Sequence, residues 1–431
     1  MLPEPHLARQ IIETLGQSGT PMPKGVSYYN VGNDSLLNAI DTHYFGSYLA
    51  DGGAVFKLVV GDYGSGKSHF LYCVRDRAWQ RNFAVSKVDL SPKESPYNDQ
   101  RRVYAAVASA LLWHELGSTG EDERGLTRFL EGTLRRLIAA HGLDVSDDGV
   151  EDIPEVRAFL HTLAATPIES LSYQKAIQGY FHGLLRGQER RLETLQRWLH
   201  GDETTTEDMR DLRLIGVTEK INKNNAFKML RSLCQTVRAL GYNGLALLFD
   251  EGDRMLSLGK RAEKDATDTL REVIDRCRED LPGALFMYAV PPDFLRVIEE
   301  YQALAQRVQA ASYFSRSNPF SPQINLEHLD IPDAEILEQI GYRLLPIFEI
   351  AYGQRLDADL QSQNVALLSE AARRSYLAIS HRRLFIKALV MEWYRQKESE
   401  EILLTPEYAE ALIRGESDAL NQLDDAQQTP Y

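Results

Sequence analysis

Residues 61–68 read Gly61-Asp62-Tyr63-Gly64-Ser65-Gly66-Lys67-Ser68, directly behind the apolar run 55–60. This is the spacing of a phosphate loop, in which consecutive backbone N–H groups wrap a triphosphate and glycines allow the close approach. Residues 69–75 are expected to continue as a helix whose N-terminus faces the anion. The stretch therefore predicts a nucleotide-binding α/β fold.

Each residue of this loop has an expected role. Gly61, Gly64 and Gly66 allow the backbone to approach the phosphates closely. Lys67 is expected to reach the β- and γ-phosphates, and Ser68 to bind Mg²⁺. A Gly/Ser turn that fits the pattern by chance is the alternative, and the strand before it and the helix after it argue against that alternative. The remaining predicted nucleotide-binding residues are Asp62, Tyr63, Ser65 and His69.

A second motif lies far along the chain. Residues 245–251, Leu-Ala-Leu-Leu-Phe-Asp-Glu, are five apolar residues followed by two acids, as in a buried parallel strand whose carboxyl end opens on a ligand crevice. Asp250 is predicted to hold Mg²⁺, and Glu251 to orient or deprotonate the attacking water. For this motif alone, a strand that ends in solvated acids is the alternative. Together the two motifs predict an ATPase that uses ATP and Mg²⁺, with Lys67 and Glu251 as catalytic residues.

Size and charge limit the classes of protein. The chain has 431 residues and a net charge of −14, so we expect two or three structural units and no surface built uniformly for nucleic acid. Cys73, Cys234 and Cys277 lie far apart without C-x-x-C spacing, which indicates core thiols in a reducing cytosol. The sequence has neither a secretory leader pattern nor an apolar run of about 18 residues. We therefore predict a soluble cytoplasmic protein without a membrane partner.

Apolar runs at 83–90, 284–290 and 322–326 predict further strands, and helices are expected at Arg102–Leu116 and Arg261–Arg278. Asp250 lies 183 residues after Lys67, whereas two βαβ units need only about 60 to 70 residues. An insertion is therefore expected, and the apolar positions of residues 117–225 recur with a helical period, which predicts that it is helical. The predicted units are a helical lead-in (1–50), a first core part (51–116), the insertion (117–225), a second core part (226–327), a helical lid (328–415) and a flexible tail (416–431).

One segment of the insertion is basic. Residues 171–200 carry Lys175, Arg186, Arg190, Arg191 and Arg197 against only two glutamates. This segment is the best local candidate for contact with DNA. A solvated helix face with ordinary pairing to acids explains it better.

The combination of phosphate loop, Asp-Glu strand, further strand and all-helical C-terminal unit resembles AAA+ P-loop ATPases of the initiator-like branch. More narrowly, residues 61–71, Val88-Asp89-Leu90-Ser91 and Ala303-Leu304-Ala305-Gln306-Arg307 are similar to the ATP-binding proteins of bacterial BREX phage-defence systems, the BrxD-like group. The resemblance implies an ATP-controlled component of an anti-phage system. It also implies assembly into a homo-oligomer or with other defence-system proteins.

The resemblance implies further site residues. Arg307 is expected to act as an arginine finger on a neighbouring subunit, with Arg316 as the fallback. Arg383 is expected to contact nucleotide from the lid, with Arg382 as its competitor. A surface salt bridge is the alternative for Arg307 and Arg316, and a solvated basic turn for Arg382 and Arg383.

One departure from the resemblance concerns turnover. The strand at 284–290 ends in Ala-Val and continues Pro-Pro-Asp, without the Asn, Ser or Thr that usually orients the water. Hydrolysis is therefore expected to be slow, partner-dependent or supported by a residue that the sequence does not identify. Two alternatives stay open at this point, a weakly hydrolysing nucleotide-gated scaffold and a DNA-remodelling or loader ATPase.

Overall fold

A six-stranded sheet forms the centre of the molecule, in a computed structural model that describes residues 2–113, 124–139, 141–145, 147, 149–255, 259–374 and 381–428. Its order is β3-β2-β4-β5-β1-β6. All neighbouring strands are parallel except β3, which runs antiparallel to β2. The predicted mixed α/β fold with a mostly parallel sheet is confirmed. The strands are β1 (Ala54–Val60), β2 (Phe83–Asp89), β3 (Leu111–Leu112), β4 (Gly244–Asp250), β5 (Ala284–Val290) and β6 (Gln323–Asn325).

The strands predicted at 55–60, 83–90, 245–251, 284–290 and 322–326 are confirmed. Every residue of β4 and β5 is buried, because helices cover both faces of the sheet. One face packs against α3 (Lys67–Gln80), and the other against α4 (Gln100–Ser109), α10 (Ala226–Ala239) and α11 (Lys260–Glu279). The helix predicted at Arg261–Arg278 is α11.

The helix predicted at Arg102–Leu116 is wrong beyond Ser109. The chain leaves α4 there, and Leu111 and Leu112 pair with the edge of β2. The unpaired backbone groups of that edge supply hydrogen-bond partners that a longer helix would not use, and the Leu111 side chain is buried. Residues 114–116 of the predicted helix lie outside the described residues.

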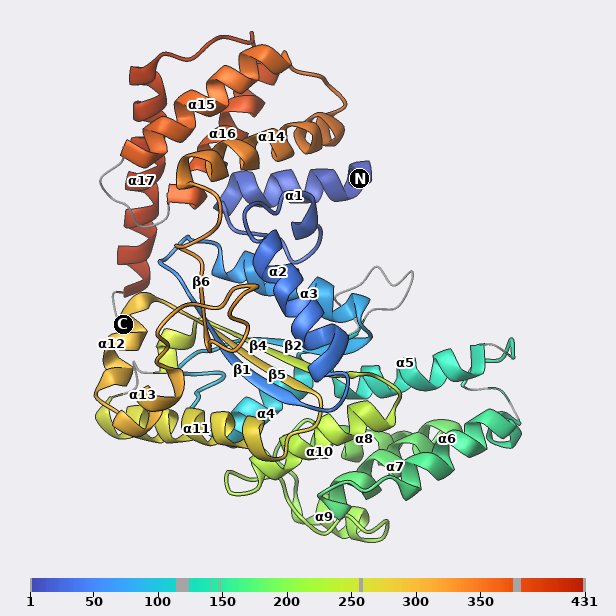
Figure 1. The fold of residues 1–431 in the computed structure, drawn as a ribbon. Helices are drawn as coiled ribbons and strands as arrows, with labels where there is room; N and C mark the ends of the chain where they lie inside the picture. Colours follow the sequence, from blue (N-terminus) through green and yellow to red (C-terminus); the bar gives the residue numbers. More distant parts are fainter. Residues whose placement is uncertain are drawn as a thin grey trace.

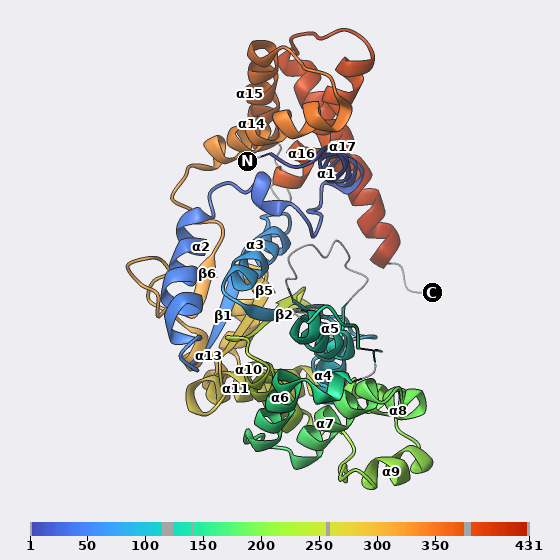
Figure 2. The same ribbon diagram turned by 90° about the vertical axis from the view of Figure 1, so that its right-hand side faces the viewer.

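The described part of the inserted segment contains five α-helices, which lie at the opposite end of the molecule from the C-terminal helices (Figures 1 and 2). They share the hydrophobic core on the α4 side of the sheet. Tyr104 of α4 fixes the junction, because its buried hydroxyl donates to the Leu199 carbonyl over 2.7 Å. The helices are α5 (Leu126–Ala139), α6 (Pro154–Ala165), α7 (Leu171–Leu185), α8 (Glu189–Leu199) and α9 (Thr206–Arg213).

The C-terminal region is helical, as predicted, with α14 (Asp333–Tyr352), α15 (Ala358–Arg374), α16 (His381–Glu398) and α17 (Pro406–Gln428). The first helix of the chain, α1 (Pro5–Ser18), packs against α14 and α16 (Figure 1). Helix α17 continues into the segment predicted as a tail. The boundaries of the predicted units stay a prediction. Among the described residues, no helix combines the length and the apolar character needed to span a bilayer.

The remaining elements are short and connect these layers. They include an eight-residue π-helix, η2 (Asp41–Tyr48), which extends α2 (Asp34–Ile40). The others are η1 (Val26–Tyr28), η3 (Val150–Asp152), η4 (Gly252–Met255), α12 (Pro292–Glu299) and α13 (Gln302–Val308).

A buried lysine in β1 fixes the loop that precedes β6. The Lys57 ammonium donates to the carbonyls of Pro319 and Ser321 over 2.8 and 2.6 Å. The rings of Tyr44 and Phe314 flank it at 4.7 and 4.9 Å. Burial lowers the pKa of Lys57 to about 7. The loop is thereby tied to the central sheet by a buried lysine.

The three cysteines are free and buried, as predicted for core thiols. Burial raises the pKa of each thiol. Since the thiolate is the reactive form, the cysteines are structural residues of the core.

Candidate nucleotide-binding site

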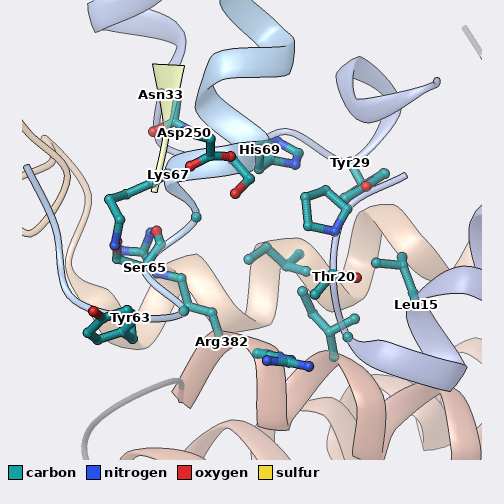
Figure 3. Close-up of a pocket in the computed structure, with 18 of the residues that line it drawn as sticks. Leu15, Thr20, Tyr29, Asn33, Tyr63, Ser65, Lys67, His69, Asp250 and Arg382 are labelled. Atoms are coloured by element: carbon teal, nitrogen blue, oxygen red, sulfur yellow. The ribbon is translucent and has the colours of Figure 1, made fainter. Parts of the chain in front are cut away.

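A cavity of about 350 Å³ opens at the carboxyl ends of β1 and β4 (Figure 3). Its walls come from the predicted phosphate loop, the Asp250-Glu251 pair, the N-terminal residues 15–33 and the helices α14 and α16. Gly61, Asp62 and Arg307 do not line it. The predicted site residues that line it are Tyr63, Gly64, Ser65, Gly66, Lys67, Ser68, His69, Asp250, Glu251 and Arg383.

The predicted phosphate loop joins the end of β1 to the start of α3. Gly64 and Gly66 have φ angles of 77° and 96°, in the left-handed region that side chains rarely adopt. A Cβ atom on Gly61 would lie 2.4 Å from the Ser65 Oγ. Glycine is therefore required at all three positions, and the N-terminus of α3 faces the cavity, where it favours an anion.

Lys67 lies at the cavity wall. Its ammonium donates to the carbonyls of Gly61 and Asp62 over 2.8 and 2.9 Å, and it lies 5.1 Å from the centre of the Tyr63 ring. Burial lowers the pKa of Lys67, while Asp250 and other carboxylates oppose this shift. The lysine is thus placed where its charge can meet an anion in the cavity.

Buried polar atoms on the cavity wall include some that have no hydrogen-bond partner among the described residues. The Ser65 Oγ, the Asn33 Oδ1 and the Tyr29 hydroxyl are such atoms, and all three residues are less than a tenth exposed. Buried polar atoms in proteins are nearly always satisfied by protein, water or ligand. The wall is therefore suited to a polar ligand, as the donor set of the loop also indicates.

The acidic pair occupies the end of β4. Asp250 accepts a hydrogen bond from the Glu251 N–H at Oδ1 over 3.0 Å. Glu251 has a φ angle of 55°, unusual for a residue with a side chain, and its carboxylate pairs with Arg254 Nε over 2.8 Å. Burial raises the pKa of Glu251, and Arg254 opposes this shift. A carboxylate with a raised pKa in a cavity is a better proton acceptor than a solvated one.

Two further contacts support the predicted phosphate loop from outside. The Tyr63 hydroxyl donates to the Asp253 carboxylate of η4 over 2.7 Å. The Asp62 N–H donates to the Glu327 carboxylate, beyond β6, over 2.9 Å. The loop is therefore tied both to the segment after Glu251 and to the connection that leads into α14.

The two neighbouring arginines of α16 have different contacts. Arg382 donates to the Ser65 carbonyl of the loop and, over 3.4 Å, to the Leu326 carbonyl. Arg383 donates to the Ser18 carbonyl at the end of α1 over 2.7 Å. Both line the cavity, but Arg382, the competitor in the sequence analysis, is the one that contacts the loop. A nucleotide contact by Arg383 stays a prediction.

Arg307 lies on α13, away from the cavity. It forms a bidentate ion pair with Asp275 of α11, in which Nε lies 2.6 Å from Oδ1 and Nη2 lies 2.9 Å from Oδ2. Its role as a finger for a neighbouring subunit stays a prediction, because such a residue acts on another copy's site. The fallback Arg316 lines a separate hollow beside His43 and Pro319.

Sequence reasoning missed the contribution of the N-terminal segment. Leu15, Gly19, Thr20 and Pro21 line the cavity, although the lead-in received no site role. The Pro/Gly-rich run at 19–25 was the available signal. Gly19 ends α1 with a φ of 64°, and a Cβ there would meet the Arg383 carbonyl at 2.7 Å.

His69 is half-buried and lines the cavity at the start of α3. Its Nε2 lies 3.2 Å from the Asn30 Oδ1. Burial, and after it the charge of Arg382, lowers the pKa of His69 to about 4. The ring is therefore neutral near pH 7, and its side chain braces the N-terminal segment against α3.

Three arginines of the basic segment of the insertion are paired with acids. Arg186, Arg190 and Arg197 each pair with an acid at 2.9 Å. This favours the ordinary paired helix face over a surface for DNA.

One comparison with known proteins identifies the family. The model of the family described as BREX system ATP-binding protein BrxC/D matches residues 4–411. No curated protein and no solved structure matches the chain. The family match covers nearly the whole sequence, including both motifs that line the cavity. The chain therefore belongs to the BrxC/D family of BREX system ATP-binding proteins, components of bacterial phage defence.

Proposed function

We propose that the chain binds ATP with Mg²⁺ in this cavity and hydrolyses it, and that its nucleotide state controls assembly within the BREX system. The observation that carries the proposal is the convergence, in one cavity, of residues 63–68 of the loop, the Asp250-Glu251 pair and Arg382. These groups come from distant parts of the chain. Their meeting at the carboxyl ends of parallel strands is the arrangement expected of an α/β ligand site.

The residues that bind phosphates are supplied by the loop and by α3. The backbone N–H groups of residues 64–68 and the helix N-terminus offer donors to the anion, and Lys67 adds a positive charge. Ser68 and Asp250 would hold Mg²⁺, which when bound offsets phosphate charge. Their oxygen donors fit this hard cation.

Glu251 is proposed as the general base that orients or deprotonates the attacking water. Its carboxylate lies on the cavity wall, and burial raises its pKa. The ion pair with Arg254 holds the carboxylate at 2.8 Å. Turnover therefore requires that the carboxylate exchange part of this contact for water.

A second function, a nucleotide-gated scaffold that hydrolyses little, is favoured by one observation. Strand β5 ends at Val290, and Pro291 and Pro292 follow, so no polar side chain at this strand end orients the water. In this case ATP binding alone would change the assembly state. Arg307 would then contribute across the boundary between copies.

The Glu251→Gln variant tests the proposal. We expect ATP binding to be kept, turnover to be lost and any ATP-dependent assembly to be trapped. Calorimetry, phosphate release and sizing with ATP, ADP or no nucleotide measure these three properties. Normal turnover in the variant contradicts the proposed mechanism. Equal assembly of the wild type and the variant, with negligible wild-type turnover, supports the scaffold instead.

A further inference from the structure

A lysine of the neighbouring strand occupies one side of Asp250. Lys87 lies on β2, which pairs with β4 in a register that places Asp89 beside Asp250. The Lys87 ammonium lies 3.2 Å from the Asp250 Oδ2 and 2.5 Å from the Asp89 Oδ1. Its Nζ also lies 5.0 Å from the centre of the Tyr72 ring. A cation of the chain itself is thus bound to the carboxylate that we assign to Mg²⁺.

This contact is shielded from water. The side chains of Lys87 and Asp250 are 10% and 7% exposed, whereas that of Asp89 is 67% exposed. Opposite charges in such surroundings interact more strongly than at the surface, because water screens them less. The ion pair between Lys87 and Asp250 is therefore little screened, whereas solvent reaches Asp89, the second partner of Lys87.

Lys87 contacts Asp250 from outside the nucleotide cavity. Lys87 and Asp89 line an adjacent hollow with Glu94 and Ser95, and neither lines the cavity that holds Lys67. The other oxygen of Asp250 is held by the Glu251 N–H over 3.0 Å. The carboxylate is thereby oriented from two sides, with one of them positively charged.

We propose that Lys87 is a positioning residue that orients Asp250 and lowers its affinity for free Mg²⁺, so that the metal binds together with nucleotide phosphates. The inference rests on the proposed function, because it takes Asp250 as a metal ligand. Its physical basis is the repulsion between the ammonium and a cation that shares the same carboxylate. Asp89 moderates this effect, because it draws the ammonium away from Asp250.

Two substitutions are therefore expected to act in opposite directions. Lys87→Met removes the charge and keeps most of the apolar stem beside Tyr72, so Mg²⁺ should bind about tenfold more tightly or better. Asp89→Asn leaves the ammonium to Asp250 alone, so Mg²⁺ should bind several-fold more weakly. In the Lys87→Met background, Asp89→Asn should have a much smaller effect, because it acts through Lys87.

The experiment measures metal binding in the full chain. One readout is the MgCl₂ concentration for half-maximal binding of a fluorescent ATP analogue, and the other is calorimetric titration of MgCl₂ without nucleotide. Lys93→Met and Asp51→Asn are matched controls that change the same charges at exposed positions, and they should leave both values unchanged. Circular dichroism checks that each variant is folded.

Unchanged or weaker Mg²⁺ binding in folded Lys87→Met overturns the inference. If Lys87→Met does not fold, Asp89→Asn alone tests the inference. Unchanged or tighter Mg²⁺ binding in Asp89→Asn then overturns the inference. Asp250→Asn separates this test from the proposed function. If Asp250→Asn does not weaken Mg²⁺ binding, the metal role of Asp250 is wrong. If it does and Lys87→Met has no effect, only the role of Lys87 is wrong.

Discussion

Replacing Lys57 with methionine should change how stability depends on pH. Burial lowers the pKa of Lys57 from 10.5 to about 7, so between these values the unfolded chain binds a proton that the folded chain lacks. The free energy of unfolding of the wild type therefore rises with pH in this window. For a folded pKa of about 7, the contribution of Lys57 grows by about 2 kcal/mol between pH 7 and pH 9.

Lys57→Met lacks this contribution, so the difference between wild type and variant isolates it from all other titrating groups. Urea unfolding at pH 7, 8 and 9, followed by circular dichroism, measures both curves. We expect the wild type to gain about 2 kcal/mol over the variant from pH 7 to pH 9. Lys223→Met, at an exposed lysine, should follow the wild type. Parallel curves for wild type and Lys57→Met would refute the reasoning, because they would show that the buried ammonium keeps its ordinary pKa.

Three further predictions concern the site. Arg382→Ala removes a charged hydrogen bond to the loop and should weaken ATP binding about tenfold to a hundredfold in calorimetry, whereas Arg383→Ala should weaken it less. Equal losses of affinity in the two variants would contradict this ranking. Gly19→Ala places a side chain at a φ of 64° beside the Arg383 backbone and should displace the N-terminal segment. Binding affinity should therefore fall more for ATP than for inorganic triphosphate, as measured by calorimetry. Equal losses of affinity for both ligands would refute the placement of this segment in the site. Arg307→Ala should leave ATP affinity unchanged and lower turnover only in assembled protein. Phosphate release across a series of protein concentrations measures this. An equal loss of turnover in dilute protein would exclude a role as an arginine finger.

The sheet and the loop could be predicted because their signals are local. The strands at 245–251 and 284–290 are continuous apolar runs, and the loop 61–68 is a fixed pattern between a strand and a helix. The helical insertion follows from its 3.6-residue period and from the long interval between the two motifs. The edge strand β3 was missed because its pairing depends on the exposed edge of β2 and not on its own two residues.

The parts of the site that could not be predicted depend on tertiary packing. Adjacent residues on a helix point about 100° apart, so the sequence cannot tell which of Arg382 and Arg383 faces the loop. The contact of Lys87 with Asp250 requires β2 to lie next to β4, although the two strands are distant in sequence. The same holds for Gly19, which reaches the cavity only because α1 packs against α14 and α16.

The most direct test of the central claim is ATP binding by the wild type and by Lys67→Ala, measured by calorimetry in the presence of MgCl₂. The Lys67 ammonium lies at the cavity wall among the loop carbonyls, where we place the β- and γ-phosphates. We predict that the variant stays folded and loses at least about a hundredfold in ATP affinity. An unchanged affinity in the folded variant would contradict the account, because ATP would then bind elsewhere in the chain.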